Sequence, residues 1–293
     1  TVIHGNVKDL GGTFIFEVYH VVFEKNFLIN SSALSAHSYC PAQTYFRYHI
    51  NAEGDLNANL LYGVLLHDYL GIIFDEPGLL KMNPEDPSLS DLVKKSYMKA
   101  IHWNWKLLTA IGVREDDVFK AFMTTSYERE LEFVKYEIDA LTATEDEYVF
   151  ENETMIRSKN FGVQGRIDRL IWNQTKNQFT LIETKTGKSS ASSKQTAQFQ
   201  LVSYSIMLQE YFDETLEELI LEYPRNEIDE RLYVVDFDEN LFFKLMEMRN
   251  QIWATSVGVR PEFGPFLHCS RCWNKEICSF YCLRNFLTNH CNT

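Results

Sequence analysis

The hydrophobic pattern of this chain changes its period near residue 148, and that change limits the possible folds more than any other feature. Before it, apolar residues recur at helical spacing, and after it they form short runs rich in β-branched and aromatic residues. The later runs predict strands at 148–156, 162–172, 178–184, 219–223 and 231–236, helices at 193–211 and 239–256, and a tight turn at 173–177 (NQTKN). This order predicts an α/β sandwich with a mixed central sheet.

The part before the change is expected to be mainly helical after one strand-like run at 13–23. Its predicted helices are 31–49, 60–74, 92–111 and 116–141. We expect one domain over residues 1–293, made of a mainly helical part at 1–147, an α/β core at 148–260 and a cysteine-rich tail at 261–293.

Composition is that of a globular chain that does not cross a membrane. Of the 293 residues, 45% are apolar and 14% are aromatic, enough to bury a sizeable core. The most apolar segment, 60–74, is short and is interrupted by His67 and Asp68. The net charge of −13 argues against a protein that wraps nucleic acid through a global positive field. A local site remains open, because divalent cations reverse the charge of clustered carboxylates.

Candidate catalytic residues lie on the two strands joined by the tight turn. The first strand carries Asp168, and the second carries Glu183 and Lys185, which are two apart and so share a face. Carboxylates are oxygen ligands suited to Mg²⁺ or Mn²⁺, and a lysine beside them can stabilise charge on a phosphodiester under attack. An exposed, salt-bridged hairpin would show the same pattern, so this motif alone does not distinguish a catalytic metal site from ordinary surface charge.

Two further motifs are ambiguous when taken singly. His67 ends the sequence Gly-Val-Leu-Leu-His and interrupts an apolar helix, where a core histidine is the ordinary explanation. Gln200 and Tyr204 lie four apart on one predicted helix and could reach a phosphate or hold the lysine, or simply pack.

Taken in order, these motifs resemble the RecB-type branch of the PD-(D/E)XK nucleases. The order is GxxxH (63–67), GxxD (165–168), ExK (183–185) and QxxxY (200–204). The resemblance implies a restriction-endonuclease-like core that uses Mg²⁺ or Mn²⁺. It also implies that His67, Asp168, Glu183 and the main-chain carbonyl of Thr184 hold the metal, that Lys185 is the catalytic lysine, and that Gln200 and Tyr204 form the auxiliary motif.

Cysteine placement indicates a metal centre in a reducing compartment, such as the cytoplasm, the nucleus or a mitochondrion. Cys40 stands alone, whereas Cys269, Cys272, Cys278, Cys282 and Cys291 lie near the end. A zinc site confined to the tail, with Cys282 as its fourth ligand, fits this spacing. The upstream cysteine followed by CxxCx5C also resembles the iron-sulfur subgroup of RecB-type nucleases, which implies a structural 4Fe-4S cluster held by Cys40, Cys269, Cys272 and Cys278 and forming a C-terminal staple.

The subgroup includes the nuclease domain of a replication helicase-nuclease, a CRISPR spacer-acquisition nuclease and a subunit of bacterial break-repair complexes. The resemblance therefore implies hydrolysis of single-stranded DNA at or near a free end, and a helicase, repair or replication complex as partner. Two alternatives stay open. One is a subunit that binds DNA ends without cutting, and the other is a zinc-stapled interaction module whose hairpin is only surface charge.

Overall fold

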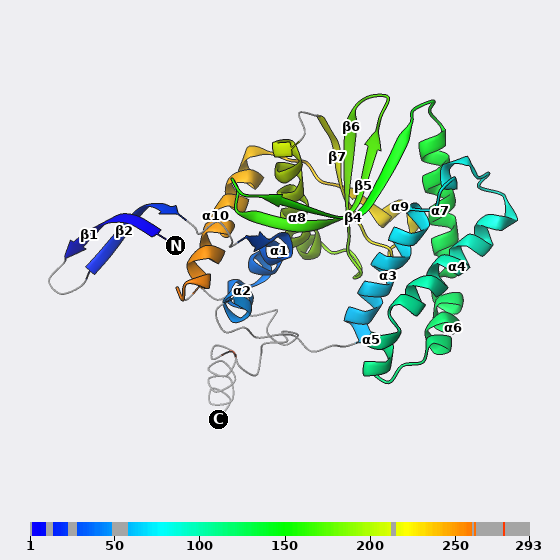
Figure 1. Cartoon of the computed structure of the whole chain (residues 1–293), viewed down its shortest axis with the longest axis horizontal. Coiled ribbons are helices and arrows are strands. Elements are labelled where there is room, and N and C mark those ends of the chain that lie inside the picture. The colour runs from blue at the N-terminus through cyan, green and yellow to red at the C-terminus, as the bar shows by residue number, and fades with distance from the viewer. Residues whose placement is uncertain are drawn as a thin grey trace.

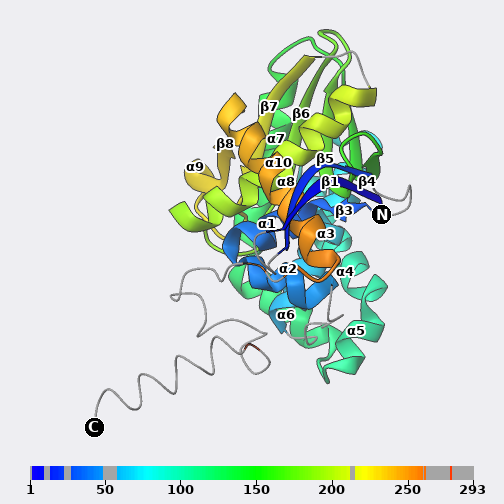
Figure 2. The same ribbon diagram turned by 90° about the vertical axis from the view of Figure 1, so that its left-hand side faces the viewer.

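The computed structural model describes residues 2–9, 14–22, 28–48, 58–211 and 215–259, together with positions 261 and 278. A mixed, six-stranded sheet forms its centre, with helices on both sides (Figures 1 and 2). The mixed α/β architecture predicted from the sequence is confirmed. Most of the cysteine-rich tail, including Cys269, Cys272, Cys282 and Cys291, lies outside the described residues.

The sheet is built around the hairpin that the sequence predicts. Its strands are β3 (Ile29–Asn30), β4 (Tyr148–Ser158), β5 (Val163–Asn173), β6 (Gln178–Thr184), β7 (Thr215–Glu222) and β8 (Leu232–Val234). The order is β3-β5-β6-β7-β8, and β4 pairs with the other edge of β5. Only the β3–β5 and β6–β7 pairs are parallel. Two further strands, β1 (Val2–Asp9) and β2 (Phe14–Val22), form a separate antiparallel ribbon, of which the sequence predicted the second.

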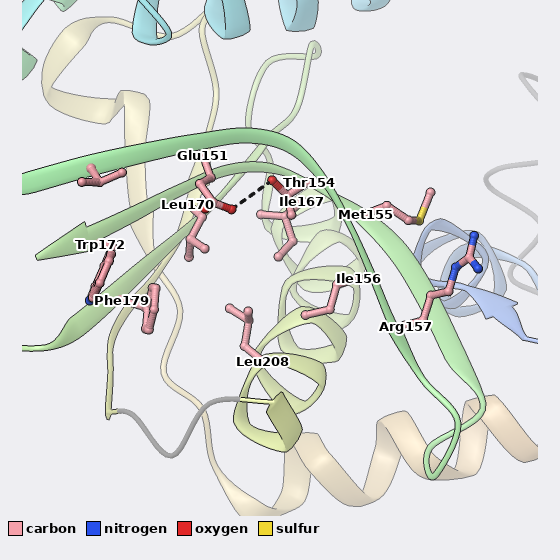
Figure 3. A pocket seen from close by; sticks show the side chains of 11 residues that line it. Glu151, Thr154, Met155, Ile156, Arg157, Ile167, Leu170, Trp172, Phe179 and Leu208 are labelled. Atoms are coloured by element: carbon pink, nitrogen blue, oxygen red, sulfur yellow. Dashed lines mark hydrogen bonds between the residues drawn. The ribbon is translucent and has the colours of Figure 1, made fainter. Parts of the chain in front are cut away.

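Apolar residues alternate between the two faces of the sheet, as a strand period of two requires. Leu170 and Leu181 pack with residues of α8 (Ala191–Tyr211), whereas Ile171 and Ile182 pack on the opposite face with Leu141, at the end of α7 (Tyr127–Thr142). On the α8 side a cavity of about 450 Å³ remains between β4 and the helix, lined mainly by apolar side chains such as Ile156 and Leu208 (Figure 3). The α10 helix (Glu239–Ser256) adds to the same core.

The helical part has more breaks than the sequence predicted. Its helices are α1 (Ser31–Tyr39), α2 (Pro41–Tyr48), α3 (Ala58–Phe74), α4 (Pro87–Trp103), α5 (Trp105–Ala110) and α6 (Glu115–Thr125), with a 3-10 turn at Leu79–Lys81. The prediction of one helix at 31–49 is wrong because the residue before a proline avoids the helical conformation: Cys40, before Pro41, is extended. The predicted helices 92–111 and 116–141 are likewise divided, at Asn104 and at Ser126.

A buried cluster of charged side chains lies between the sheet and α7. Arg231, at the end of α9 (Ile228–Arg231), donates to Glu222 on β7 at 2.9 and 2.7 Å and to Glu130 on α7 at 3.0 Å. Arg169 on β5 lies 3.4 Å from Glu222 and 3.6 Å from Glu137, also on α7. All five side chains are buried, so this charge cluster fixes the helical part against the sheet.

Burial raises the pKa values of Glu130 and Glu137. Burial acts in the same direction on Glu222, but the two guanidinium groups together hold the pKa of Glu222 below its ordinary value. The arginines therefore favour the charged form of Glu222 most strongly within the charge cluster.

Within the described residues, none of the helices combines the length and the apolar character that crossing a bilayer requires.

Candidate active site

The candidate site lies where β5 loses its strand partner. Along one edge of β5, residues 163–164 pair with β3 and residues 169–173 pair with β6, so 165–168 lie in a gap between the two partners. Side-chain hydroxyls donate to main-chain carbonyls of β5 in and beside this gap. The hydroxyl of Tyr204 donates to the carbonyl of Arg166 at 2.8 Å, and that of Ser31 donates to the carbonyl of Gln164 at 3.1 Å. The gap leaves Asp168 accessible at the point where β5 and β6 separate.

Close packing in this gap explains the glycine of the GxxD motif. A Cβ atom at Gly165 would lie 2.5 Å from the ring of Tyr204 and 2.6 Å from the hydroxyl of Ser31. Any larger residue would push Tyr204 away from the strand. Gly165 therefore leaves room for the ring of Tyr204, whose hydroxyl occupies the gap in strand pairing beside Asp168.

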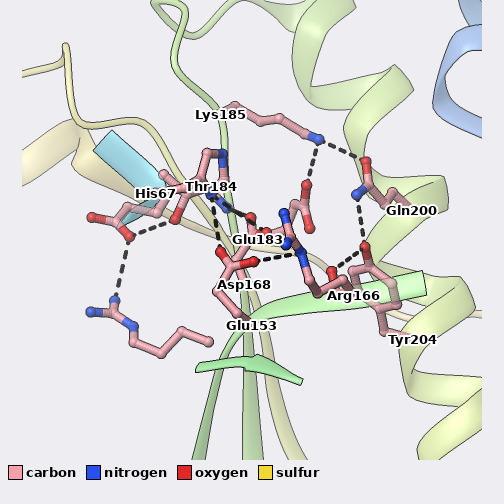
Figure 4. Close-up of polar contacts among 11 residues, drawn as sticks. His67, Glu153, Arg166, Asp168, Glu183, Thr184, Lys185, Gln200 and Tyr204 are labelled. Carbon is pink, nitrogen blue, oxygen red and sulfur yellow. Dashed lines mark hydrogen bonds and ion pairs between the residues drawn. The ribbon is translucent and has the colours of Figure 1, made fainter. Parts of the chain in front are cut away.

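Lysine, glutamine and tyrosine form one chain of hydrogen bonds across the site (Figure 4). Lys185 donates to Glu183 at 2.6 Å and to Gln200 at 2.8 Å. Gln200 donates in turn to the hydroxyl of Tyr204 at 2.8 Å. The helical spacing of Gln200 and Tyr204 on α8 thus fixes the direction of the lysine side chain, which is one of the roles that the sequence left open.

Three hydrogen bonds fix the main chain at Thr184 and Lys185. Its N–H donates to Asp168 at 2.8 Å, and its hydroxyl donates to Glu222 of the buried charge cluster at 3.0 Å. The N–H of the next residue, Lys185, donates to the carbonyl of Glu222 at 2.7 Å. The main chain between Glu183 and Lys185 is therefore fixed in place, together with the carbonyl that the resemblance assigns to the metal.

A histidine and a third carboxylate complete the site. The Nδ1 atom of His67, on α3, lies 3.5 Å from Asp168 and 3.9 Å from Glu153 on β4. Burial lowers the pKa of His67, which keeps a nitrogen lone pair available to a cation. His67, Glu153 and Asp168 each offer a ligand atom within 4.8 Å of the others, so this group could bind a metal ion.

Sequence reasoning missed Glu153. In the antiparallel register, β4 pairs Asn152 with Arg169 and Thr154 with Ile167, which puts Glu153 opposite Asp168. Its φ of 55° lies in the left-handed region, which costs a residue with a side chain on the order of 1–2 kcal/mol. Counting this register back from Asp168 could have found Glu153, because opposite residues of antiparallel strands share a face.

Both hairpin carboxyl groups hold their protons unusually tightly. Burial, opposed by Lys185, raises the pKa of Asp168 to about 7. Burial and the neighbouring Asp168 raise the pKa of Glu183 to about 7. Burial lowers the pKa of Lys185, but Glu183 and Asp168 outweigh it and raise that pKa above its ordinary value. Near neutral pH, a divalent cation that binds Asp168 and Glu183 can therefore displace protons from the two carboxyl groups.

The arrangement fits a divalent cation with oxygen ligands. Glu183 is 2% exposed, and one of its oxygens, Oε2, is buried without a hydrogen-bond partner in the described part of the chain. A buried, unpartnered carboxylate oxygen is costly unless something else binds it. This burial also contradicts the interpretation of the hairpin as exposed surface charge.

A family comparison agrees with this geometry. The family model of the PD-(D/E)XK nuclease superfamily matches residues 29–279, most of the chain. The chain belongs to the PD-(D/E)XK nuclease superfamily. Members of this superfamily are typically metal-dependent nucleases. The residues that the sequence motifs singled out lie in one connected group: His67, Asp168, Glu183, Thr184, Lys185, Gln200 and Tyr204. A comparison with curated proteins found no match.

The structure leads to a prediction for Glu153. Replacing Glu153 by Gln removes one charged oxygen beside His67 and Asp168, so we expect Mn²⁺ affinity to fall about tenfold or more. Titration calorimetry of the metal-free protein measures this directly. Glu151→Gln, an exposed carboxylate two residues earlier on the same strand, is the matched control and should bind Mn²⁺ like the parent protein. Equal affinities in all three proteins would remove Glu153 from the site.

Proposed function

We propose that this chain is a Mg²⁺- or Mn²⁺-dependent nuclease that hydrolyses single-stranded DNA from or near a free end. The observation that carries the proposal is the buried carboxylate of Glu183 beside Lys185 and the more accessible Asp168, with one oxygen of Glu183 left unpartnered among the described residues. The proposed metal ligands are His67, Asp168, Glu183 and the carbonyl of Thr184, with Glu153 added from the structure. A bound divalent cation would polarise the phosphodiester and ease deprotonation of the attacking water.

Lys185 is the proposed catalytic lysine. Its ammonium group has three hydrogens, of which Glu183 and Gln200 accept two. The third can point to a phosphate oxygen, where a positive charge stabilises the negative charge that develops during attack. Gln200 and Tyr204 hold the ammonium group in that position, because Tyr204 is itself fixed to the carbonyl of Arg166.

The substrate and the position of cutting can be tested with end-labelled oligonucleotides. Single strands labelled at one end and left unblocked should be degraded with Mg²⁺ or Mn²⁺ and left intact in EDTA. We expect blocking of one end to stop degradation and duplex of the same sequence to resist it. Cutting of a circular single strand would overturn the free-end part of the proposal. Binding of DNA ends without cutting in any of these ions would favour the subunit alternative.

A 4Fe-4S cluster bound by Cys40, Cys269, Cys272 and Cys278 is a further part of the proposal. Cys278 is buried in one apolar cluster with Ala42 and Phe46, and Cys40 packs against the same cluster. Neither of these two cysteines is in a disulfide, and the apolar surroundings suit thiolates that ligate iron away from water. The support for the proposal is this meeting of residues from opposite ends of the chain.

Replacing Cys40 by Ser tests the cluster. If the proposal holds, purified protein is brown with absorbance near ~400 nm, and Cys40→Ser bleaches that colour. The variant should also unfold at lower temperature, because the link between Cys40 and the tail closes most of the chain into one loop. Cys282→Ser is the matched control and should change neither property. A colourless, zinc-containing protein that tolerates Cys40→Ser but not Cys282→Ser would favour the zinc site instead.

A further inference from the structure

One stretch of the helical part differs in charge from the chain as a whole. The protein has a net charge of −13, yet residues 92–114 contain no Asp or Glu and include Lys94, Lys95, Lys99, Lys106 and Arg114. This stretch covers most of α4 and all of α5, which meet at Asn104. A positive surface on an acidic protein is a local feature that requires its own explanation.

Two tryptophans flank the junction and point away from the core. Trp103 is 57% exposed and Trp105 is 47% exposed. The ammonium of Lys99 lies 5.0 Å from the centre of the Trp103 ring, and that of Lys106 lies 5.8 Å from the centre of the Trp105 ring. In the described part of the chain, no carboxylate forms an ion pair with Lys99 or Lys106. We call Lys99, Trp103, Trp105 and Lys106 the elbow surface.

A hydrogen bond joins the residue between the two tryptophans to α3, the helix that carries His67. Asn104 is buried, and its side-chain amide donates to the carbonyl of Ala100 and to the carboxylate of Asp68. Asp68 follows His67 on α3, so the elbow surface is anchored to the helix that brings His67 to Asp168.

We propose that the elbow surface binds single-stranded nucleic acid and holds the part of the strand that lies outside the active site. The faces of unpaired bases stack on aromatic rings, and a base stacked on either tryptophan would bring its own phosphate toward the adjacent ammonium. Duplex DNA hides those faces, so the surface selects single strands. This inference rests on the proposed function, because it assigns the bound strand as the one that is cut.

Paired substitutions test the elbow surface in the full chain. With a labelled thirty-nucleotide oligo-dT in EDTA, Trp103→Ala/Trp105→Ala should weaken binding about tenfold or more, the scale of losing base stacking. Lys99→Ala/Lys106→Ala should also lower the slope of log affinity against log salt by about 1.4, or ~0.7 for each lost phosphate contact. Phe243→Ala/Lys244→Ala, which removes an exposed aromatic and lysine from α10, is the matched control and should bind like the parent.

Cutting and binding separate this inference from the proposed function. If the parent cuts single strands while both elbow variants bind and cut the thirty-mer equally well, the elbow proposal is overturned and the nuclease stands. If neither the parent nor any variant cuts with Mg²⁺ or Mn²⁺ but the elbow variants still lose binding, the elbow proposal stands and the proposed nuclease function fails. If the elbow variants lose binding to duplex DNA as much as to single strands, the elbow surface attracts DNA by charge alone. If they bind DNA like the parent but lose binding to a protein, the elbow surface is a protein-binding site. Either result overturns the proposal.

Discussion

Asp168→Asn and Glu183→Gln are each expected to abolish cleavage, with a loss on the order of 10³-fold or more, while the protein stays folded. Each change removes one charged oxygen from the proposed metal site without creating a cavity. Gel assays with Mg²⁺ or Mn²⁺ measure the loss. Lys185→Ala should instead keep its affinity for the metal and lose rate by roughly 10² to 10³. Cleavage retained by either carboxylate variant at millimolar Mg²⁺ would contradict the site.

The same variants should be more stable than the parent when metal is absent. Burial raises the pKa values of Asp168 and Glu183 from 3.8 and 4.5 to about 7, so the folded protein holds protons that the unfolded chain releases. The stability of metal-free parent protein should therefore fall as pH rises from about 4 to about 7 and stay low above it. Thermal unfolding in EDTA at pH 8 should show higher melting temperatures for Asp168→Asn and Glu183→Gln, and added Mn²⁺ should stabilise the parent most.

Arg231→Ala is expected to cause the largest loss of stability, about 3–5 kcal/mol in the free energy of unfolding. Arg231 is fully buried, and removing it leaves Glu222 and Glu130 without their main counter-charge. It also removes a guanidinium whose carbon lies 3.4 Å from the centre of the Phe133 ring. Denaturant unfolding monitored by circular dichroism measures the difference.

An exposed arginine provides the contrast. Arg114 pairs with Asp116 at 3.4 Å, but both side chains are at least 75% exposed, so Arg114→Ala should cost no more than about 1 kcal/mol. An Arg231→Ala protein within about 1 kcal/mol of the parent would show that the charge cluster does not fix the helical part against the sheet.

Local pattern was enough to predict the hairpin and the residues it carries. Asp168, Glu183 and Lys185 converge as expected because a strand period of two and a tight turn determine which side chains share a face. Gln200 and Tyr204 follow from helical spacing in the same way. Five of the six strands of the sheet around them were also predicted, with other lengths for β7 and β8, but the short β3 was not.

The missed features depend on contacts between different elements and not on the pattern within one element. Glu153 belongs to the site through its register with β5, and its left-handed φ has no signal in the sequence. Arg231 and Glu130 are 101 positions apart, so nothing local distinguishes them from ordinary surface charges. The roles of Cys269 and Cys272 stay predictions, because both lie outside the described residues.

The alternation of faces along β5 and β6 separates two kinds of substitution. Asp168 and Glu183 belong to the candidate site, whereas the next residues, Arg169 and Thr184, contact the buried charge cluster on the other face. Apolar replacement of the charge cluster should therefore be separable from changes at the candidate site. Thr184 is the exception, because its N–H donates to Asp168 and its hydroxyl donates to Glu222.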